Sequence, residues 1–91
     1  MTRRVDFRVA HLELAWRASE RGELLLGGTV GEPVESAVLL FRCDSPAIPT
    51  AFAQADPYVV NGLVTNWRVE PWNTIVGDEA ANPLHPDHNA R

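Results

Sequence analysis

The stretch that most constrains the fold is residues 3–21, RRVDFRVAHLELAWRASER. At 100° per residue it follows a helical pattern, and one narrow stripe of the predicted helix holds Val5, Val9, Leu12 and Trp16. The charged residues cluster on another arc, which should face water. Further apolar residues lie outside both arcs, so the apolar arc covers more than half of the circumference. An ordinary surface helix shows a narrower apolar arc.

Two polar residues, Arg8 and His11, lie inside this wide apolar arc. They are three positions apart, which places them on adjoining helical surface. A buried polar group without a partner costs about 1–3 kcal/mol. A helix histidine satisfied by some neighbour is the commonest arrangement, but two polar residues placed in this way favour a shared interior partner. A carboxylate is the natural one.

The next segment predicts a hairpin. Gly22 should end the helix as a C′ glycine. Residues 23–28 predict a short apolar strand closed by the Gly27-Gly28 pair, and the turn-rich residues 29–35 predict the hairpin connection. Residues 36–42 predict a second strand, and its continuous apolar run from Ala37 to Phe41 favours a central place in the sheet.

A second helix and a third strand should follow. Ser45-Pro46 predicts an N-cap and a proline at the first helical position, for a helix that runs to about Ala55. Residues 63–72 alternate between apolar and polar side chains, which predicts a strand after the Asn61-Gly62 turn. Residues 78–91 have no periodicity, so we expect a disordered tail after one domain at residues 1–77.

The order α-β-β-α-β indicates an α+β fold with helices packed on one face of the sheet. It corresponds to a ferredoxin-like β-α-β-β-α-β unit without its first strand. Because that strand is interior in the topology, its loss should leave an unpaired gap. We therefore expect that the native start lies upstream, with a further strand. The sheet of this chain would then be completed by another chain, by the tail or not at all.

Composition excludes several classes of function. The net charge of −4 argues against a protein that binds the backbone of nucleic acids, because such proteins need a basic face. No apolar run approaches the roughly 18 residues of a membrane span, and no secretory leader is recognisable. The single cysteine, Cys43, has no internal disulfide partner. We therefore expect a cytoplasmic protein that binds neither nucleic acid nor membrane.

Asp56 is the leading candidate for the carboxylate that His11 and Arg8 require. Followed by Pro57, it has the pattern of an N-cap for a short helix. Alternatively it ends the second helix, because a residue before proline avoids the α region. There it would meet the negative end of the helix dipole, which is unfavourable by about 0.3–1 kcal/mol unless a cation is near. His11 or Arg8 would be that cation, and a His–Asp pair would be suited to acid–base chemistry.

Other residues carry weaker signals. No nucleophile is convincing, because Ser36 begins a strand and Cys43 follows one. Gly28, with its neighbour, could let a ligand approach the backbone, although a strand-ending turn is the more common reason for such a pair. Tyr58 could present its hydroxyl to the Asp56 site or simply pack in a turn.

The tryptophans and the histidines of the tail could have a functional role, but each also has a structural explanation. The three tryptophans could stack on a planar ligand, fill the core or lie in a subunit interface. The tail sequence HPDH, residues 85–88, has two histidines and an acid, but it lies in a Pro- and Asn-rich terminus. We expect it to be solvated and not to be a metal site.

Three segments resemble the YciI-like (YCII-related) family: FRVAHLELAWRASERGELLLGG, AVLLFRCDSP and AFAQADPYVVNGLVTNWRVEPWNTIVG. The similarity runs from about Arg4 to Gly77. Its most specific parts are the Arg-x-x-His pattern of the first helix and the Asp-Pro-Tyr-Val pattern before the last predicted strand. The chain departs from the family at its start, where the family's first strand is missing.

The resemblance implies a ferredoxin-like fold that pairs two sheets in a dimeric α+β barrel, and hence a homodimer. It also implies a cleft with a His–Asp dyad, here His11 and Asp56. Elimination on a chlorinated, hydroxylated aromatic ring is one activity attached to the family, and such a reaction needs acid–base chemistry rather than a metal.

Three functions are compatible with these features. In the first, the protein is a lyase or isomerase without a cofactor that acts on a small cyclic or aromatic compound. His11 would then be the acid–base catalyst and Asp56 would orient it, while Arg8, Tyr58 and Gly28 would bind the substrate. In the second, the protein is a dimeric module that binds a small metabolite without catalysis. The third is a structural or partner-binding domain.

Overall fold

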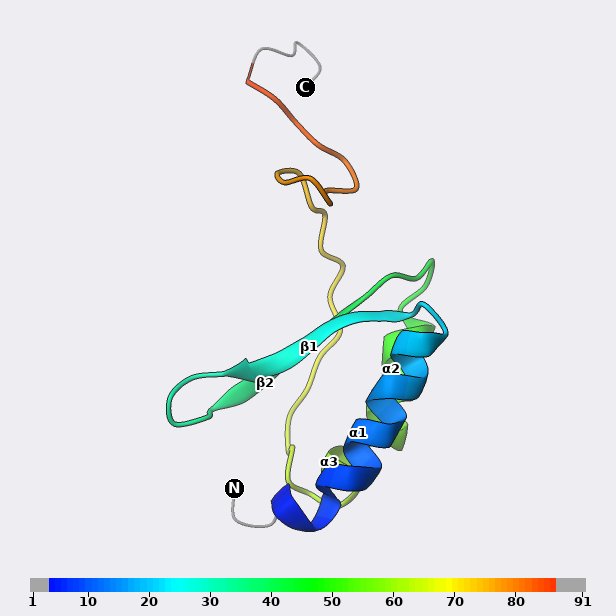
Figure 1. Ribbon diagram of the computed structural model, residues 1–91, viewed down its shortest axis with the longest axis vertical. Coiled ribbons are helices and arrows are strands. Elements are labelled where there is room, and N and C mark those ends of the chain that lie inside the picture. The colour runs from blue at the N-terminus through cyan, green and yellow to red at the C-terminus, as the bar shows by residue number, and fades with distance from the viewer. Residues whose placement is uncertain (1–3, 87–91) are drawn as a thin grey trace.

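The computed structural model describes residues 4–86, and these form a small α+β fold (Figure 1). A long first helix is followed by a hairpin of two strands, and two shorter helices come next. The elements are α1 (Arg4–Glu20), β1 (Leu24–Val30), β2 (Ser36–Phe41), α2 (Ala47–Ala55) and α3 (Pro57–Val60). The first four elements of the predicted order α-β-β-α-β are therefore present, and they are followed by the short helix α3.

α1 ends as its sequence predicts. The Gly22 N–H donates to the Ser19 carbonyl at 2.9 Å, and the Glu23 N–H donates to the Ala18 carbonyl at 3.0 Å. This is the Schellman pattern, in which a left-handed residue satisfies the last carbonyls of a helix. Gly22 has a φ of +80°, which a side chain would disfavour.

The two apolar sides of α1 have different environments. Ala18 is fully buried, and His11, Leu14 and Ala15 are partly buried on the same side. The narrow stripe predicted from the sequence is instead exposed: Val5 (66 %), Val9 (69 %), Leu12 (44 %) and Trp16 (65 %). The charged arc is exposed, as predicted. The wide apolar arc thus corresponds to one face packed within the chain and a second face that the described chain leaves uncovered.

The core is small and lies where the end of α1 meets the hairpin and α2. Its buried members are Ala18, Leu24 and Phe52, one from each of these elements. Phe41 of β2 packs edge-on against Phe52, with ring centroids 5.4 Å apart. Such aromatic pairs contribute about 0.5–1.5 kcal/mol beyond the area they bury. Neither β1 nor β2 is covered along its whole length, because the hairpin extends away from the helices (Figure 1).

The sheet has two antiparallel strands, with Gly28 opposite Val38 and Val30 opposite Ser36. Two expectations about it are wrong. β2 is not central, because within residues 4–86 it pairs with β1 alone. The glycine pair does not end its strand, because both glycines lie inside β1, which continues to Val30.

The third strand predicted at residues 63–72 does not form in the described part of the chain, where residues 61–86 contain no helix or strand. Residues 65–72 make no backbone hydrogen bond within residues 4–86. A strand is stable only when a neighbouring strand pairs with its ladder of hydrogen bonds, and no strand within residues 4–86 pairs with this segment. The alternation of apolar and polar residues is a local pattern, so it cannot show whether a neighbouring strand is present.

Part of the predicted tail is hydrogen-bonded to the segment before it. The Asn82 N–H donates to the Thr74 carbonyl at 3.0 Å, and the Leu84 N–H donates to the Ile75 carbonyl at 2.8 Å. Residues 87–91 lie outside the described part of the chain, so the disorder expected there remains a prediction.

The tryptophans are not core residues of this chain. Trp67 and Trp72 belong to the extended segment and are exposed, as is Trp16 of α1. Of the three roles considered for them, packing in the core is therefore wrong for the described residues. Stacking on a ligand and contact with a partner remain predictions.

The role of Gly22 at the end of α1 can be tested by comparing its substitution with that of Gly28, a glycine inside a strand. Gly22→Ala should lower the free energy of unfolding by about 1–2 kcal/mol, because alanine must adopt a left-handed conformation there. Gly28→Ala should be neutral or stabilising by about 0.5–1 kcal/mol, since Gly28 lies in a strand and a Cβ would meet open space. Urea unfolding followed by circular dichroism measures both. Equal stabilities of the two variants would contradict the assigned helix end.

Candidate functional site

Asp56 lies at the junction of two helices. Its backbone is extended, with φ −66° and ψ 123°, as expected for a residue before proline. α2 therefore stops at Ala55, and Pro57 occupies the first position of α3. The Asp56 carboxylate accepts a hydrogen bond from the Tyr58 N–H at 3.0 Å. Both roles predicted for Asp56 from its local sequence are therefore present: it ends α2, and its side chain caps α3.

The second helix begins one residue later than the sequence predicts. α2 starts at Ala47 with Pro46 at the cap position, where no side chain is available to accept a bond. The Ser45 hydroxyl nevertheless accepts from the Ala47 N–H at 3.0 Å. The Ser45 hydroxyl thus satisfies the N–H of Ala47, which lies two positions later in the chain and belongs to the first turn of α2. Serine side chains commonly make this contact in tight turns.

The same Asp56 oxygen also bonds to α1. His11 Nδ1 lies 2.8 Å from Asp56 Oδ1, although the two residues are 45 positions apart in the chain. The His11 side chain is 19 % exposed and that of Asp56 is 10 % exposed. The predicted pairing of His11 with Asp56 is therefore present in the structure, at a short hydrogen-bond distance and largely sheltered from water.

Tyr58 completes the cluster. Its ring stacks on the His11 imidazole with centroids 4.0 Å apart and planes inclined by 11°. The backbone N–H of the same residue bonds to the Asp56 carboxylate. One residue therefore holds both members of the pair, through its ring and through its backbone. Tyr58 lies at the site, as expected, with its ring as the group in contact.

This geometry prepares the imidazole for proton transfer. Because the carboxylate accepts at Nδ1, the Nδ1–H tautomer is favoured, and Nε2 of a neutral ring is left with its lone pair. A carboxylate that holds a histidine in this way fixes both its tautomer and its orientation. A proton acceptor with a fixed direction is the requirement for general acid–base catalysis.

The other predicted site residues are placed differently. The Arg8 side chain is exposed and makes no hydrogen bond or ion pair within residues 4–86, so the expectation that it shares Asp56 with His11 is wrong. It lies one turn before His11 on α1. Gly28 is exposed within β1. Ser36 and Cys43 are exposed at and just beyond the ends of β2, and neither is hydrogen-bonded to His11 or Asp56.

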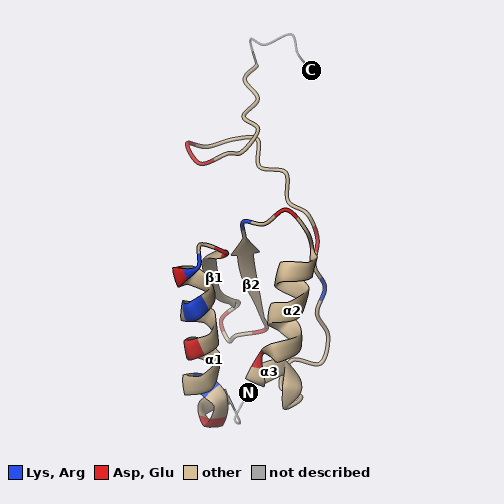
Figure 2. Ribbon diagram, turned by 90° about the vertical axis from the view of Figure 1, so that its right-hand side faces the viewer, with Lys and Arg blue, Asp and Glu red and all other residues tan. Residues whose placement is uncertain are grey.

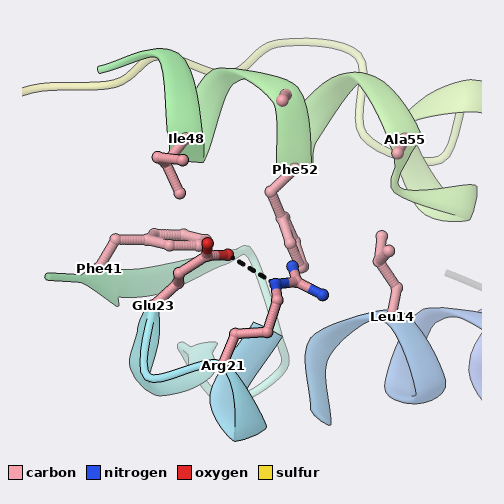
Figure 3. A pocket seen from close by; sticks show the side chains of 8 residues that line it. Leu14, Arg21, Glu23, Phe41, Ile48, Phe52 and Ala55 are labelled. Atoms are coloured by element: carbon pink, nitrogen blue, oxygen red, sulfur yellow. Dashed lines mark hydrogen bonds and ion pairs between the residues drawn. The ribbon is translucent and has the colours of Figure 1, made fainter. Parts of the chain in front are cut away.

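A pocket that the sequence did not predict lies between α1, α2 and β2 (Figure 3). It has a volume of about 290 Å³, and its walls are mostly apolar. An ion pair between Arg21 and Glu23, at 3.0 Å, lies on one side of it. The residues that line the pocket are Leu14, Arg21, Glu23, Phe41, Ile48, Ala51, Phe52 and Ala55.

Neither His11 nor Asp56 lines this pocket, but its wall includes their near neighbours. Leu14 is one turn after His11 on α1, and Ala55 immediately precedes Asp56. The signal in the sequence was the apolar stripe of α2, which contributes Ile48 and Phe52. Phe52 is also a buried core residue, so the same face of α2 lines the pocket and packs within the chain.

Two kinds of feature are not found in the described residues. Within residues 4–86, no three His, Cys, Asp or Glu side chains are grouped so as to hold a metal ion. The HPDH motif is described only as far as Pro86, and its Asp87 and His88 lie outside the described residues. None of the described helices combines the length and the apolar character that crossing a membrane requires.

The double role of Asp56 leads to a stability prediction. Asp56→Ala removes the cap of α3 and the acceptor for His11, and should lower the free energy of unfolding by about 2–3 kcal/mol. Asp56→Asn keeps an oxygen that can accept from both donors, so we expect a loss of about 1 kcal/mol or less. Thermal unfolding followed by circular dichroism provides the measurement. Asp44→Ala, in an exposed loop, is the control and should stay within about 0.5 kcal/mol of the wild type. Equal losses at positions 44 and 56 would contradict the structural role of Asp56.

The tautomer of His11 can be observed directly. At a pH at which the imidazole is neutral, long-range ¹H–¹⁵N correlation spectra should show a protonated Nδ1 and an unprotonated Nε2. The Asp56→Ala variant should lose this preference, because the acceptor at Nδ1 is gone. A predominantly Nε2–H form in the wild type would be incompatible with the hydrogen bond between His11 and Asp56.

Comparison with known proteins found no match among family models, curated proteins or solved structures. Function is therefore inferred from the chemistry of the cluster formed by His11, Asp56 and Tyr58. The distinctive property of that cluster is an oriented histidine, with one ring nitrogen hydrogen-bonded to a carboxylate and its ring stacked on Tyr58.

Proposed function

We propose that this protein is an acid–base enzyme of the lyase or isomerase type, which needs no cofactor and acts on a small cyclic or aromatic compound. The observation that carries the proposal is the 2.8 Å contact between His11 Nδ1 and Asp56 Oδ1 in a sheltered site. His11 is the proton-transferring residue. Asp56 and Tyr58 are positioning residues that act through it.

In an elimination, His11 Nε2 takes a proton from a carbon atom of the substrate. The electrons of that C–H bond form the new double bond, and the leaving group departs with the electrons of its own bond. In an isomerisation, the same nitrogen returns the proton to a different atom. Either course uses one base with a fixed direction, which typically accelerates a reaction about 10²- to 10⁴-fold. Asp56 stabilises the imidazolium formed in between.

The pocket supports a cyclic or aromatic substrate. Its volume of about 290 Å³ and its aromatic walls, Phe41 and Phe52, suit a single ring with small substituents. Two residues that line the pocket are near the His–Asp pair in sequence: Leu14 is three positions after His11, and Ala55 immediately precedes Asp56. Arg8, exposed and one turn from His11, is available to hold an anionic group of the substrate.

The fold proposal follows from the same residues. We infer a ferredoxin-like, YciI-like domain that assembles as a dimeric α+β barrel. The order α-β-β-α and the meeting of His11 with Asp56 both support this inference. The segment at residues 63–72 also supports it, because its sequence has the alternation of a strand and residues 65–72 make no backbone hydrogen bond within residues 4–86. An additional strand beside it would complete the sheet.

One observation favours a second candidate function, a dimeric module that binds a small metabolite without catalysis. The pocket is lined by residues other than His11 and Asp56. A ligand held wholly between Phe41, Ile48 and Phe52 would not need to reach the imidazole. In that case the His–Asp hydrogen bond would serve only to fasten α1 to the α2–α3 junction.

The experiment that tests the proposal compares His11→Gln with the wild type and with His85→Gln, which removes a histidine outside the cluster. Each protein is incubated with a panel of hydroxylated aromatic and alicyclic compounds, some with a chlorine substituent. Product formation is followed by liquid chromatography and chloride release, and binding by calorimetry. We expect turnover in the wild type and in His85→Gln, with a loss of about 10²- to 10⁴-fold in His11→Gln and retained binding.

The two candidate functions give different results in this panel. Binding without turnover in all three proteins would favour the metabolite-binding module. Turnover that His11→Gln leaves unchanged would overturn the assigned role of His11. Asp56→Asn refines the test, because it retains an acceptor but not a negative charge, and should reduce kcat more than it raises KM.

A further inference from the structure

Two charged residues, Arg21 and Glu23, belong to the otherwise apolar wall of the pocket between α1, α2 and β2. α1 and α2 lie side by side above the hairpin (Figure 2). In Figure 3 the side chains of Ile48 and Phe52 point into the pocket from α2, and those of Arg21 and Glu23 reach toward it from the opposite side. Pockets for small ligands commonly combine apolar walls with a few fixed polar groups that set the orientation of the ligand. The pair of Arg21 and Glu23 is therefore the polar contact that a ligand of this pocket would meet.

The turn that ends α1 holds the pair in place. Gly22, with a φ of +80°, lies between the two residues and turns the chain from α1 toward β1. The Glu23 N–H donates to the Ala18 carbonyl at 3.0 Å, and the Glu23 carbonyl accepts from the Arg42 N–H at 2.8 Å. Arg21 Nε then donates to Glu23 Oε1 at 3.0 Å. Glu23 is thus fixed by backbone hydrogen bonds on both sides, and its carboxylate positions the guanidinium.

The pair has unused hydrogen-bonding groups of both kinds. Within residues 4–86, the terminal N–H groups of Arg21 and the Oε2 atom of Glu23 make no hydrogen bond. The Arg21 side chain is 54 % exposed and that of Glu23 is 29 % exposed, so a ligand can reach both. One side chain is a cation and the other an anion, so a charged ligand would be attracted by one and repelled by the other. A neutral group that accepts from Arg21 and donates to Glu23 satisfies both.

An amide edge is the neutral group that matches this arrangement. A primary carboxamide or a lactam presents a carbonyl oxygen and an N–H on two different atoms that face the same way. The carbonyl can accept from Arg21 while the N–H donates to Glu23, so each side chain has its own partner. A hydroxyl group, by contrast, must serve both side chains through a single oxygen. The pocket volume of about 290 Å³ is near the lower end of the usual range and suits one ring with such a substituent.

We propose that the ligand of this pocket is a neutral compound with one ring and one amide edge, and that Arg21 and Glu23 select and orient it. As an assignment of the substrate, this inference rests on the proposed function. Arg8 does not line the pocket, so the contact proposed for it with another substituent of the substrate is unaffected.

The pair also gives the ligand a direction. Leu14 and Ala55 are the pocket residues nearest in sequence to the His–Asp pair, and Leu14 precedes Arg21 by seven positions, or about two helical turns. The amide edge is therefore held away from His11. The opposite side of the ring is directed toward Leu14 and Ala55, the end of the pocket from which the imidazole is approached.

Titrations followed by ¹H–¹⁵N correlation spectra test the class of ligand. The probes are benzamide, benzyl alcohol, benzoate, benzylamine and N,N-dimethylbenzamide, which share one ring and differ in its substituent. Benzamide should bind about tenfold more tightly than each of the others, and the backbone N–H signals of Ala51 and Phe52 should shift. The dimethyl compound keeps the carbonyl acceptor but has no N–H to donate to Glu23.

Three results would overturn the proposal. Equal affinities for benzamide and benzyl alcohol would contradict the amide edge. Tighter binding of benzoate or benzylamine than of benzamide would contradict selection by a pair without net charge. Absence of binding by every probe would show that the pocket does not take a ligand of this class.

Removing one charge of the pair should change the preference in a defined direction. Glu23→Gln leaves the Arg21 cation unbalanced, so benzoate should bind about tenfold more tightly than it does to the wild type. Arg21→Gln leaves the Glu23 anion unbalanced, so benzylamine should gain in the same way. Circular dichroism checks that each variant is folded. An order of affinities that both substitutions leave unchanged would overturn the role of the pair.

A second arginine–glutamate pair provides the matched control. Arg68 and Glu70 are also two positions apart and form an ion pair through Arg68 Nε, but neither residue lines the pocket. Arg68→Gln and Glu70→Gln should therefore leave the order of affinities as it is in the wild type. A change in that order as large as the one caused by Glu23→Gln would show that the effect is one of overall charge, and would overturn the assignment to the pocket.

This inference and the proposed function fail in different ways, because affinity is measured without turnover. Turnover that depends on His11, together with equal binding of all the probes, would overturn the role of Arg21 and Glu23 and leave the acid–base function standing. A preference for benzamide without turnover of any compound would support the role of the pair as a binding element and count against the acid–base function.

Discussion

The hydrogen bond between His11 and Asp56 is the interaction on which the arrangement of the helices depends. It joins the middle of α1 to the junction of α2 and α3, and the same carboxylate oxygen caps α3. The buried apolar core of the described residues, by contrast, consists of Ala18, Leu24 and Phe52 and lies at the C-terminal end of α1. The position of α3 against α1 therefore depends strongly on a polar contact. Such a contact has a defined direction, whereas apolar burial is largely non-directional.

In this site the same carboxylate has a structural role, as the cap of α3, and a proposed chemical role, as the group that orients His11. A carboxylate placed to cap a helix must accept N–H bonds, and a carboxylate placed to orient a histidine must also accept one. Asp56 Oδ1 meets both demands at 2.8 and 3.0 Å. The structural role of Asp56 does not compete with the proposed chemistry. The hydrogen bond from the Tyr58 N–H restricts the motion of the carboxylate, and a carboxylate with a fixed position orients the imidazole more precisely.

Local signals in the sequence were sufficient for the C-terminal ends of α1 and α2 and for the presence of the hairpin, and they made Asp56 the leading candidate for the partner of His11. Each depends on a residue with a strong intrinsic preference, such as Gly22 at a left-handed position or Asp56 before Pro57. Local signals were not sufficient for the apolar face of α1 or for residues 63–72. A helical wheel shows two apolar sides without showing which one packs within the chain. Alternation shows that a segment could pair, but not whether a neighbouring strand exists.

Tyr58 links the cluster to the rest of the chain. Its carbonyl accepts from the N–H groups of Leu63 and Val64, at 2.9 and 3.0 Å, just where the extended segment begins. The residue whose ring lies on the imidazole therefore also sets the direction in which the following residues leave α3. The cluster and the beginning of the extended segment therefore share one residue: the Tyr58 ring contacts the imidazole, and the Tyr58 carbonyl accepts the first hydrogen bonds of the segment.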